Sequence, residues 1–375
     1  MNKKVVIVQR RLTHYRAPLF ELLRNELGSR RTRLELLVGR GTPLEEERHD
    51  SVKLEWSTQI PTYYFAGNRI CWQPFFSHLE DADLVIVAQE NALLANHLMV
   101  ISPRKFRLAF WGHGANLQSA NPRGLKERYK RWTTNQVDWW FCYTQLSAKL
   151  VTAAGFLGHR ITVLNNAVDT SELIRQRLSI SAEELLALRQ SLQFGEGPVG
   201  VFVGSLHKNK RLEFLFEAVD ALHREVDGFQ LLILGDGPER NRVQEWCRAR
   251  PWAHWAGARF GREKAGYLSL ADVMLNPGLV GLGIIDSFVC GVPMVTTDWK
   301  GHSPEIAYLE NGRNAIMAGN DLRHYVDVVK RLLREPRGLS VLQAGCAVSA
   351  AEYTLENMVG RFAEGIENAL GPPSS

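Results

Sequence analysis

Hydrophobic positions along this chain gather in short runs, and longer helical patterns separate one run from the next. In the first half, runs of strand length stand at Val5–Val8, Leu34–Val38, Leu84–Val87, Leu108–Trp111, Trp140–Tyr143 and Ile161–Leu164. A second series stands at Val199–Val203, Leu231–Leu234, His254–Trp255, Val273–Leu275 and Met294–Val295. Continuous apolar runs of this length are typical of strands buried in a parallel sheet. Because strand and helix alternate in two blocks, the pattern predicts an α/β protein with two doubly wound, Rossmann-like domains.

A change of pattern between the two blocks marks the domain boundary. A polar stretch leads into a charged helical pattern at Ser181–Leu192 and ends in a Gly-Glu-Gly-Pro cluster at residues 195–198. Beyond Ser349, apolar residues recur at helical spacing and predict a closing amphipathic helix. We therefore expect an N-terminal domain at 1–170, a linker and C-terminal domain at 171–348, and a helix at 349–375 that can pack back on the first domain.

Composition limits the cellular compartment and the classes of binding partner that we expect. The apolar runs are far shorter than the ~20 residues that span a bilayer, so we expect no integral membrane segment. The five cysteines are scattered and form no CxxC pair, which favours a reducing, cytoplasmic compartment without structural zinc. A net charge of +5 favours anionic partners such as nucleotide phosphates or lipid headgroups. Nothing in the sequence resembles a nucleic-acid-binding module, so nucleic acid is not an expected partner.

Ligands of open α/β sheets bind at the carboxyl ends of the strands, and two glycine turns follow predicted strands of the second domain. The first runs from Gly204 and Ser205 to Lys210 and Arg211, and places basic side chains where a diphosphate would lie. An ordinary solvated basic loop explains the same residues. The second turn, beginning at Gly235, also fits a simple tight turn before a helix.

A third segment, Asn276–Pro293, places several glycines at a predicted junction between a strand and a helix. Free backbone N–H groups at a helix N-terminus bind anions, so the amides near Gly281, Leu282 and Gly283 are candidates for the same diphosphate. Asp286 follows within the first helical turns, and its carboxylate can accept both hydroxyls of a ribose. A capping or helix-dipole role is the alternative for Asp286.

Taken together, the segment at about 195–315 resembles the retaining glycosyltransferases of family 4, which have the GT-B fold. The motifs that carry the resemblance are the Gly-x-Leu loop with a downstream lysine, the Gly-Asp-Gly-Pro turn and the glycine-rich segment before Asp286. Lys210 matches the lysine of the family and Asp286 its second glutamate. Gly278 stands where the family has its first glutamate, and Ser205 stands where an arginine is common. The resemblance implies two Rossmann-like domains that face each other across a cleft.

The first domain supplies candidates for the sugar and acceptor. His113, between two glycines after a predicted strand, resembles the active-site histidine that holds a donor-sugar hydroxyl in the family, although a structural turn histidine is the alternative. The loop after the first strand contains Arg10, Arg11, His14 and Arg16. In GT-B enzymes this loop faces the acceptor, so its basic residues suit an anionic acceptor such as a lipid pyrophosphate. A contact with the donor phosphates is the alternative.

The segment Arg123–Trp132 interleaves basic residues with Tyr129 and Trp132. Lysine and arginine beside interfacial aromatic residues favour contact with an anionic membrane surface. An exposed helix face in contact with water gives the same pattern. The first interpretation predicts a protein at the inner face of the cytoplasmic membrane.

The resemblance implies a retaining glycosyltransferase that moves a sugar from a nucleotide-sugar to a lipid-linked or polysaccharide acceptor, in bacterial-type surface glycan or lipopolysaccharide biosynthesis. It needs no cofactor and no metal, because Lys210 and the amides of Leu282 and Gly283 would stabilise the departing nucleoside diphosphate. Two alternatives remain: a non-catalytic nucleotide-sugar-binding partner of an active transferase, and a GT-B nucleotide-sugar epimerase. A dinucleotide-dependent oxidoreductase is disfavoured, since no Gly-x-Gly-x-x-Gly follows the first strand.

Overall fold

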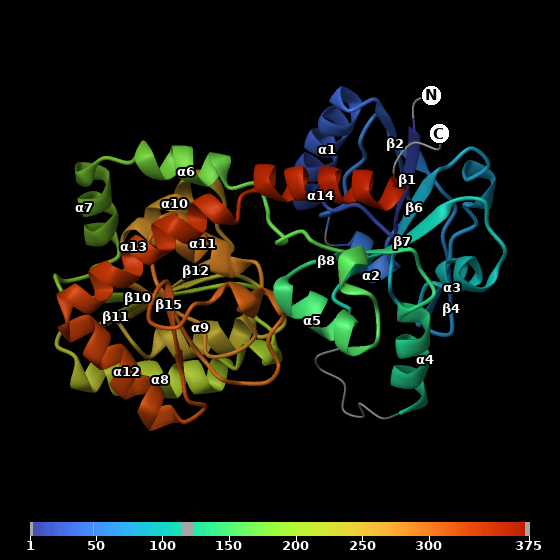
Figure 1. Ribbon diagram of the computed structural model, residues 1–375. Helices are drawn as coiled ribbons and strands as arrows, with labels where there is room; N and C mark the ends of the chain where they lie inside the picture. Colours follow the sequence, from blue (N-terminus) through green and yellow to red (C-terminus); the bar gives the residue numbers. More distant parts are fainter. Residues whose placement is uncertain (1–2, 48, 115–123, 372–375) are drawn as a thin grey trace. The chain divides into compact units, whose positions relative to one another are not determined.

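The computed structural model describes residues 3–47, 49–114 and 124–371, which fold into two compact α/β units (Figure 1). Unit 1 comprises Met1–Asp169 and Leu355–Ser375, and unit 2 comprises Thr170–Thr354. Arg123, the first residue of the predicted membrane-contacting segment, lies outside the described residues. None of the described helices combines the length and the apolar character needed to cross a bilayer.

Unit 1 contains a parallel sheet of seven strands in the order β3-β2-β1-β6-β7-β8-β9. In chain order these strands are β1 (Lys3–Gln9), β2 (Thr32–Val38), β3 (Thr58–Gln59), β6 (Leu84–Ala88), β7 (Arg107–Gly112), β8 (Trp139–Cys142) and β9 (Ile161–Val163). Ile7 in β1 pairs with Leu36 and with Ile86, so the chain reverses its direction of winding between β1 and β6. The two-residue edge strand β3 and the hairpin of β4 (Tyr63–Phe65) and β5 (Ile70–Trp72) were not predicted.

The helices of unit 1 connect these strands, with short 3-10 turns between some of them. They are η1 (His14–Arg16), α1 (Ala17–Ser29), α2 (Pro43–Glu46), η2 (Phe76–His78), α3 (Leu94–Ile101), α4 (Leu125–Thr134), α5 (Gln145–Ala153), η3 (Gly158–Arg160) and α14 (Leu355–Leu370). The last helix packs against α1 and against β7, β8 and β9 (Figure 1). Its buried Phe362 lies 5.0 Å from Trp111 and 4.7 Å from Phe141, measured between ring centroids. The segment that follows unit 2 in the sequence therefore completes the core of unit 1.

Unit 2 contains a parallel sheet of six strands in the order β12-β11-β10-β13-β14-β15. These strands are β10 (Val199–Val203), β11 (Gln230–Leu234), β12 (Ala253–Gly257), β13 (Val273–Leu275), β14 (Met294–Thr297) and β15 (Ala315–Ala318). The order is the Rossmann order, and its switch point lies between β10 and β13. The predicted strands of both series are confirmed, whereas β15 was missed because its run of four residues is too short to stand out.

The helices of unit 2 surround this sheet. They are α6 (Ser171–Leu178), α7 (Ala182–Ser191), η4 (Lys208–Lys210), α8 (Leu212–Glu225), α9 (Arg240–Arg248), α10 (Gly261–Ser269), α11 (Gly283–Cys290), η5 (Pro304–Tyr308), α12 (Leu322–Arg334) and α13 (Pro336–Glu352). The closing helix was expected to begin at residue 349, but α13 continues to Glu352 and the closing helix, α14, begins at Leu355. The apolar residues Met358, Phe362 and Ile366 are buried in α14, as their helical spacing indicates.

Candidate functional site

The turn between β10 and α8 buries a lysine at the carboxyl edge of the sheet of unit 2. Lys210 ends η4, and 9% of its surface is exposed. Its Nζ donates a hydrogen bond to the carbonyl oxygen of Leu279 at 2.6 Å. Burial lowers the pKa of Lys210 to about 8, and no carboxylate forms an ion pair with it in the described part of the chain. A buried cation without a counter-charge attracts an anion strongly, because little water screens it.

Arg211, the next residue, is already engaged within unit 2. It adopts a left-handed backbone conformation with φ 55°. Its Nη1 donates hydrogen bonds to Pro277 O at 3.2 Å, Thr297 Oγ1 at 3.2 Å and Asn320 Oδ1 at 2.5 Å. The guanidinium therefore connects the carboxyl ends of β13, β14 and β15, which is a structural role. Its predicted contact with the donor stays a prediction.

The two glycine turns pack backbone against backbone at this edge. A Cβ on Gly235 would lie 1.8 Å from the carbonyl oxygen of Gly204, so only glycine fits there. Leu206 N donates to Asp236 O at 2.9 Å and ties the two turns together. Ser205 is exposed beside them. The predicted donor residues Gly204, Ser205 and Gly235 thus lie at one edge, close to Lys210.

In the loop between β13 and α11, Gly278 packs tightly against the backbone of the η4 turn. A Cβ there would lie 2.4 Å from the carbonyl carbon of Lys210 and 2.5 Å from Asn209 O, so a side chain has no room. Leu279 N donates to Asn209 O at 2.9 Å and holds the two segments in this contact. The absence of a glutamate at this position therefore has a steric cause.

A buried histidine, which the sequence did not single out, supports the same loop from another side. His302 Nδ1 accepts a hydrogen bond from Val280 N at 3.1 Å, and its Nε2 donates to Thr297 O at 2.8 Å. Burial lowers the pKa of His302 and keeps the ring neutral, which these two opposite roles require. The position of the loop, and with it the amides before α11, depends on this ring.

Helix α11 begins at Gly283, and no side chain caps its N-terminus at Leu282. Gly281, Leu282 and Gly283 are partly exposed, as amides that bind an anion must be. Asp286 lies in the first turn, where its Oδ2 accepts from Lys264 Nζ of α10 at 2.7 Å. The side chain of Asp286 is 16% exposed and that of Lys264 22%. Sequence reasoning missed Lys264, because a pair between two helices has no local signal.

Unit 2 also contains a buried acidic residue close in sequence to His302. Glu305 in η5 is a buried carboxylate, 3% exposed, that the sequence analysis did not identify. Among the residues described, no group of three or more His, Cys, Asp or Glu side chains is placed to hold a metal ion. The Lys210 ammonium and backbone amides are among the donors at the carboxyl edge of the sheet.

In unit 1, His113 directly follows β7 and its side chain is exposed. Its ring lies edge-on to Tyr143, with 4.5 Å between centroids. His14 is likewise exposed, in η1 beside Tyr15. Both histidines lie where β1 and β7 end, at the carboxyl edge of the sheet.

Two of the predicted acceptor-side arginines already have carboxylate partners. Arg10 forms a two-pronged ion pair with Glu45, with both N–O distances 2.7 Å. This pair holds the pKa of Glu45 at about 2. Arg11 Nη1 lies 2.7 Å from Asp50 Oδ1. The basic loop seen in the sequence is thus largely neutralised by tertiary contacts, which weakens the argument for Arg10 and Arg11 as ligand-binding residues.

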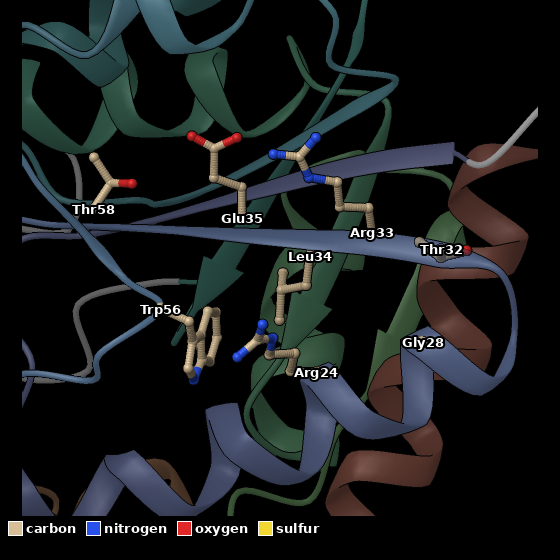
Figure 2. Close-up of a pocket in the computed structure, with 8 residues that line it drawn as sticks. All are labelled: Arg24, Gly28, Thr32, Arg33, Leu34, Glu35, Trp56 and Thr58. Atoms are coloured by element: carbon tan, nitrogen blue, oxygen red, sulfur yellow. The ribbon is translucent and has the colours of Figure 1, made fainter.

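Unit 1 also contains a cavity of about 320 Å³ between α1 and the first half of β2 (Figure 2). Arg24 and Trp56 line it, with the Arg24 Cζ 4.7 Å from the centroid of the indole ring. Ligands of α/β sheets bind at the carboxyl ends of the strands, whereas Thr32 and Arg33 at this cavity begin their strand. The cavity is therefore separate from the candidate site.

Comparison with known proteins agrees with this geometry. Residues 197–335 match the family described as glycosyl transferases group 1. The GDP-mannose-dependent alpha-(1-6)-phosphatidylinositol monomannoside mannosyltransferase of Mycobacterium tuberculosis is 25% identical over 191 residues, which make up 47% of this chain and 49% of the relative. The chain thus spans about half the length of the curated relatives it matches.

Solved structures resemble the fold over nearly the whole chain. Anabaena Alr3699/HepE in complex with UDP has a TM-score of 0.69 at 15% identity, covering 97% of this chain and 99% of that one. The lipopolysaccharide outer core galactosyltransferase WaaB has a TM-score of 0.68 at 14% identity, with the same coverage. The chain therefore has the GT-B fold, and its second unit contains a segment similar to the group 1 glycosyltransferases.

Proposed function

We propose that this chain is a retaining glycosyltransferase of family 4, which transfers a sugar from a nucleotide-sugar without a metal or cofactor. The observation that carries the proposal is Lys210: a buried ammonium without an ion-pair partner among the described residues, at the carboxyl edge of a Rossmann-like sheet. Glycine turns and the N-terminus of α11 surround the same edge. These are the groups that bind a diphosphate.

In the proposed reaction, negative charge develops on the departing nucleoside diphosphate. The Lys210 ammonium and the amides of Leu282 and Gly283 stabilise that charge where it forms, so they act on the transition state more than on the bound donor. Asp286 accepts hydrogen bonds from the ribose through the carboxylate oxygen that Lys264 does not engage. His113 holds a hydroxyl of the transferred sugar. No residue is assigned as a covalent nucleophile.

We further propose that the acceptor is lipid-linked or a polysaccharide, at the cytoplasmic face of the membrane, in surface glycan or lipopolysaccharide biosynthesis. Two comparisons support this setting: the mycobacterial relative is named for a phosphatidylinositol mannoside, and WaaB for the lipopolysaccharide outer core. An exposed apolar surface on unit 1, described next, gives independent support.

The exposed apolar surface, here called the α3–α4 face, joins two helices of unit 1. The ring of Tyr129 of α4 is tilted against that of His97 of α3, with 5.3 Å between ring centroids, and its hydroxyl hydrogen-bonds to Nδ1 at 3.1 Å. Exposed apolar side chains on the two helices are Leu94, Leu98, Ile101, Tyr129 and Trp132. Arg128 and Arg131 are exposed on α4 beside the aromatic rings. Apolar and aromatic side chains next to cations suit an anionic lipid surface.

A panel of nucleotide-sugars tests the proposed function. We expect one donor to raise the melting temperature of the protein, because it binds the folded state only. With a suitable acceptor, we expect the product to keep the anomeric configuration of the donor, as read by NMR. Donor binding without hydrolysis or transfer would instead support a non-catalytic partner, and inversion at a ring carbon of the donor would support an epimerase.

A further inference from the structure

Arg16 differs from its neighbours in the basic loop of unit 1. Arg10 and Arg11 form ion pairs with carboxylates, whereas Arg16 forms none with any described residue. Its Nη1 is enclosed, and no described residue offers it a hydrogen-bond acceptor. Within the described part of the chain, no carboxylate therefore compensates the positive charge of this guanidinium.

Three aromatic rings surround the Arg16 guanidinium. Its Cζ lies 5.5 Å from the ring centroid of Tyr15, 5.8 Å from that of Trp111 and 5.7 Å from that of Tyr143. Cation–π contacts stabilise a guanidinium over such faces without neutralising its charge. The rings thus hold the cation in place and leave its hydrogen-bonding capacity unused.

Trp111, beneath the guanidinium, has a second unused donor. The side chain is 4% exposed, and its indole Nε1 has no hydrogen-bond acceptor among the described residues. Buried N–H groups are almost always paired, so two neighbouring side chains that each have an unpaired donor are unusual. Both lie where β1 and β7 end, and His113 follows Trp111 by two residues. Both side chains lack a hydrogen-bond acceptor among the described residues, and the charge of Arg16 favours an anionic one.

We propose that Arg16 and Trp111 form an oxyanion subsite on unit 1 that binds a phosphoryl group. Arginine matches the geometry of phosphate through its planar fork, and an indole N–H can donate to one further oxygen. The phosphoryl group belongs to the acceptor or to the donor diphosphate, and this choice of source rests on the proposed glycosyl transfer.

Binding of inorganic pyrophosphate to the full chain tests the subsite. Lys210→Met removes the strongest competing cation of unit 2, so titration calorimetry on this background reports the remaining sites. We expect Arg16→Gln to weaken pyrophosphate binding about tenfold or more, which is the loss of one charge-assisted contact. Arg24→Gln is the matched control, because Arg24 also lies over an indole ring in unit 1, at the separate cavity of Figure 2. We expect this control to bind pyrophosphate unchanged.

A conservative variant tests whether a loss of binding in Arg16→Gln comes from misfolding. Arg16→Lys keeps the charge but lacks the fork, so we expect an affinity between those of the parent and the glutamine variant. Unchanged pyrophosphate binding in both Arg16 variants would overturn the proposal, as would equal losses in Arg24→Gln. Absence of pyrophosphate binding to the Lys210→Met parent would overturn it as well.

To decide whether the phosphoryl group comes from the donor or the acceptor, Arg16→Gln is made in the chain that keeps Lys210, and nucleotide binding is measured. If the subsite serves the donor, Arg16→Gln weakens binding of UDP or GDP about tenfold. If it serves the acceptor, nucleotide binding is unchanged, and the variant loses pyrophosphate binding to the nucleotide-saturated protein. These binding measurements need no turnover, so a chain that binds pyrophosphate through Arg16 but transfers no sugar would contradict the proposed function and leave the subsite intact.

Discussion

Gly278 and Lys210 lie backbone against backbone in unit 2, and a Cβ on the glycine would fall 2.4 Å from the carbonyl carbon of the lysine. This contact explains why the chain has no glutamate at the position where the family it resembles has one. The same contact also affects the charge at this edge, because the turn that packs against Gly278 is the turn that buries the Lys210 ammonium. A side chain at 278 would displace the cation on which the proposed diphosphate site depends.

Gly278→Ala is expected to destabilise the protein by about 1–3 kcal/mol, since the added methyl group must push the η4 turn away. The same displacement should weaken binding of a nucleoside diphosphate. Chemical denaturation and titration calorimetry measure the two effects. Gly360→Ala in α14 is the control, because a Cβ there meets nothing within 4 Å. A Gly278→Ala protein as stable as the control variant would contradict the steric argument.

Lys210 should make diphosphate binding depend on pH. Its pKa is about 8 in the unliganded chain, so the cation is lost as the pH rises through that value. The affinity for UDP or GDP should therefore fall between neutral pH and about pH 9, whereas Lys210→Met should bind tenfold or more weakly at neutral pH and show no such fall. An unchanged affinity in the variant would place the diphosphate elsewhere.

The lowered pKa of Lys210 also affects stability, and its contribution changes with pH in the direction opposite to that of diphosphate binding. The pKa of Lys210 is lowered from 10.5 to about 8 by burial, so between these values the unfolded chain binds more protons than the folded one. The contribution of this group to the free energy of unfolding should accordingly rise with pH across that window. Comparing denaturation of the wild type and Lys210→Met at several pH values isolates the contribution.

Asp286→Ala is expected to lower affinity for nucleotides with an intact ribose diol, while binding of inorganic pyrophosphate stays nearly constant. The reason is that its carboxylate keeps one oxygen for the ribose beside the ion pair with Lys264. Lys264→Met serves as the comparison, because it breaks the ion pair but keeps the carboxylate. If both variants lose ribonucleotide and pyrophosphate affinity equally, Asp286 acts through the ion pair on the position of α11.

His113→Ala should lower kcat more than it weakens donor binding. A hydroxyl contact that strengthens in the transition state affects turnover first. The measurement is a comparison of kcat with the donor dissociation constant, and His113→Asn retains a hydrogen-bonding side chain as a control. Wild-type turnover in the alanine variant would return His113 to a structural role beside Tyr143.

The α3–α4 face should bind anionic vesicles reversibly, with each basic residue near the surface contributing about 1 kcal/mol. Substituting Lys126, Arg128, Lys130 and Arg131 by glutamine should release the protein, and salt should weaken binding of the wild type. Vesicle co-sedimentation measures both effects, with neutral lipid as the control. Ile101→Ser should weaken binding through the apolar part of the face. If the wild-type protein does not co-sediment with anionic vesicles at low salt, the membrane proposal is contradicted.

The amino-acid sequence by itself determined the alternation of strands and helices, because buried parallel strands leave continuous apolar runs and turns leave glycines. It also placed Lys210 and His113 after strands and Asp286 in the first turns of a helix, since position relative to a strand or helix is a local property. The short strands β3 and β15 escaped it because two to four residues carry too little pattern. The assignment of α14 to unit 1 requires contacts between residues far apart in the sequence.

Only the tertiary structure decided which charged groups remain unpaired. The sequence shows a loop of four basic residues, and long-range ion pairs neutralise Arg10 and Arg11 but leave Arg16 without a carboxylate among the described residues. In the same way, Lys264 reaches Asp286 from another helix, and the η4 turn fills the space at Gly278. Charge compensation and steric room depend on distances across the fold, and a linear pattern of residues does not contain those distances.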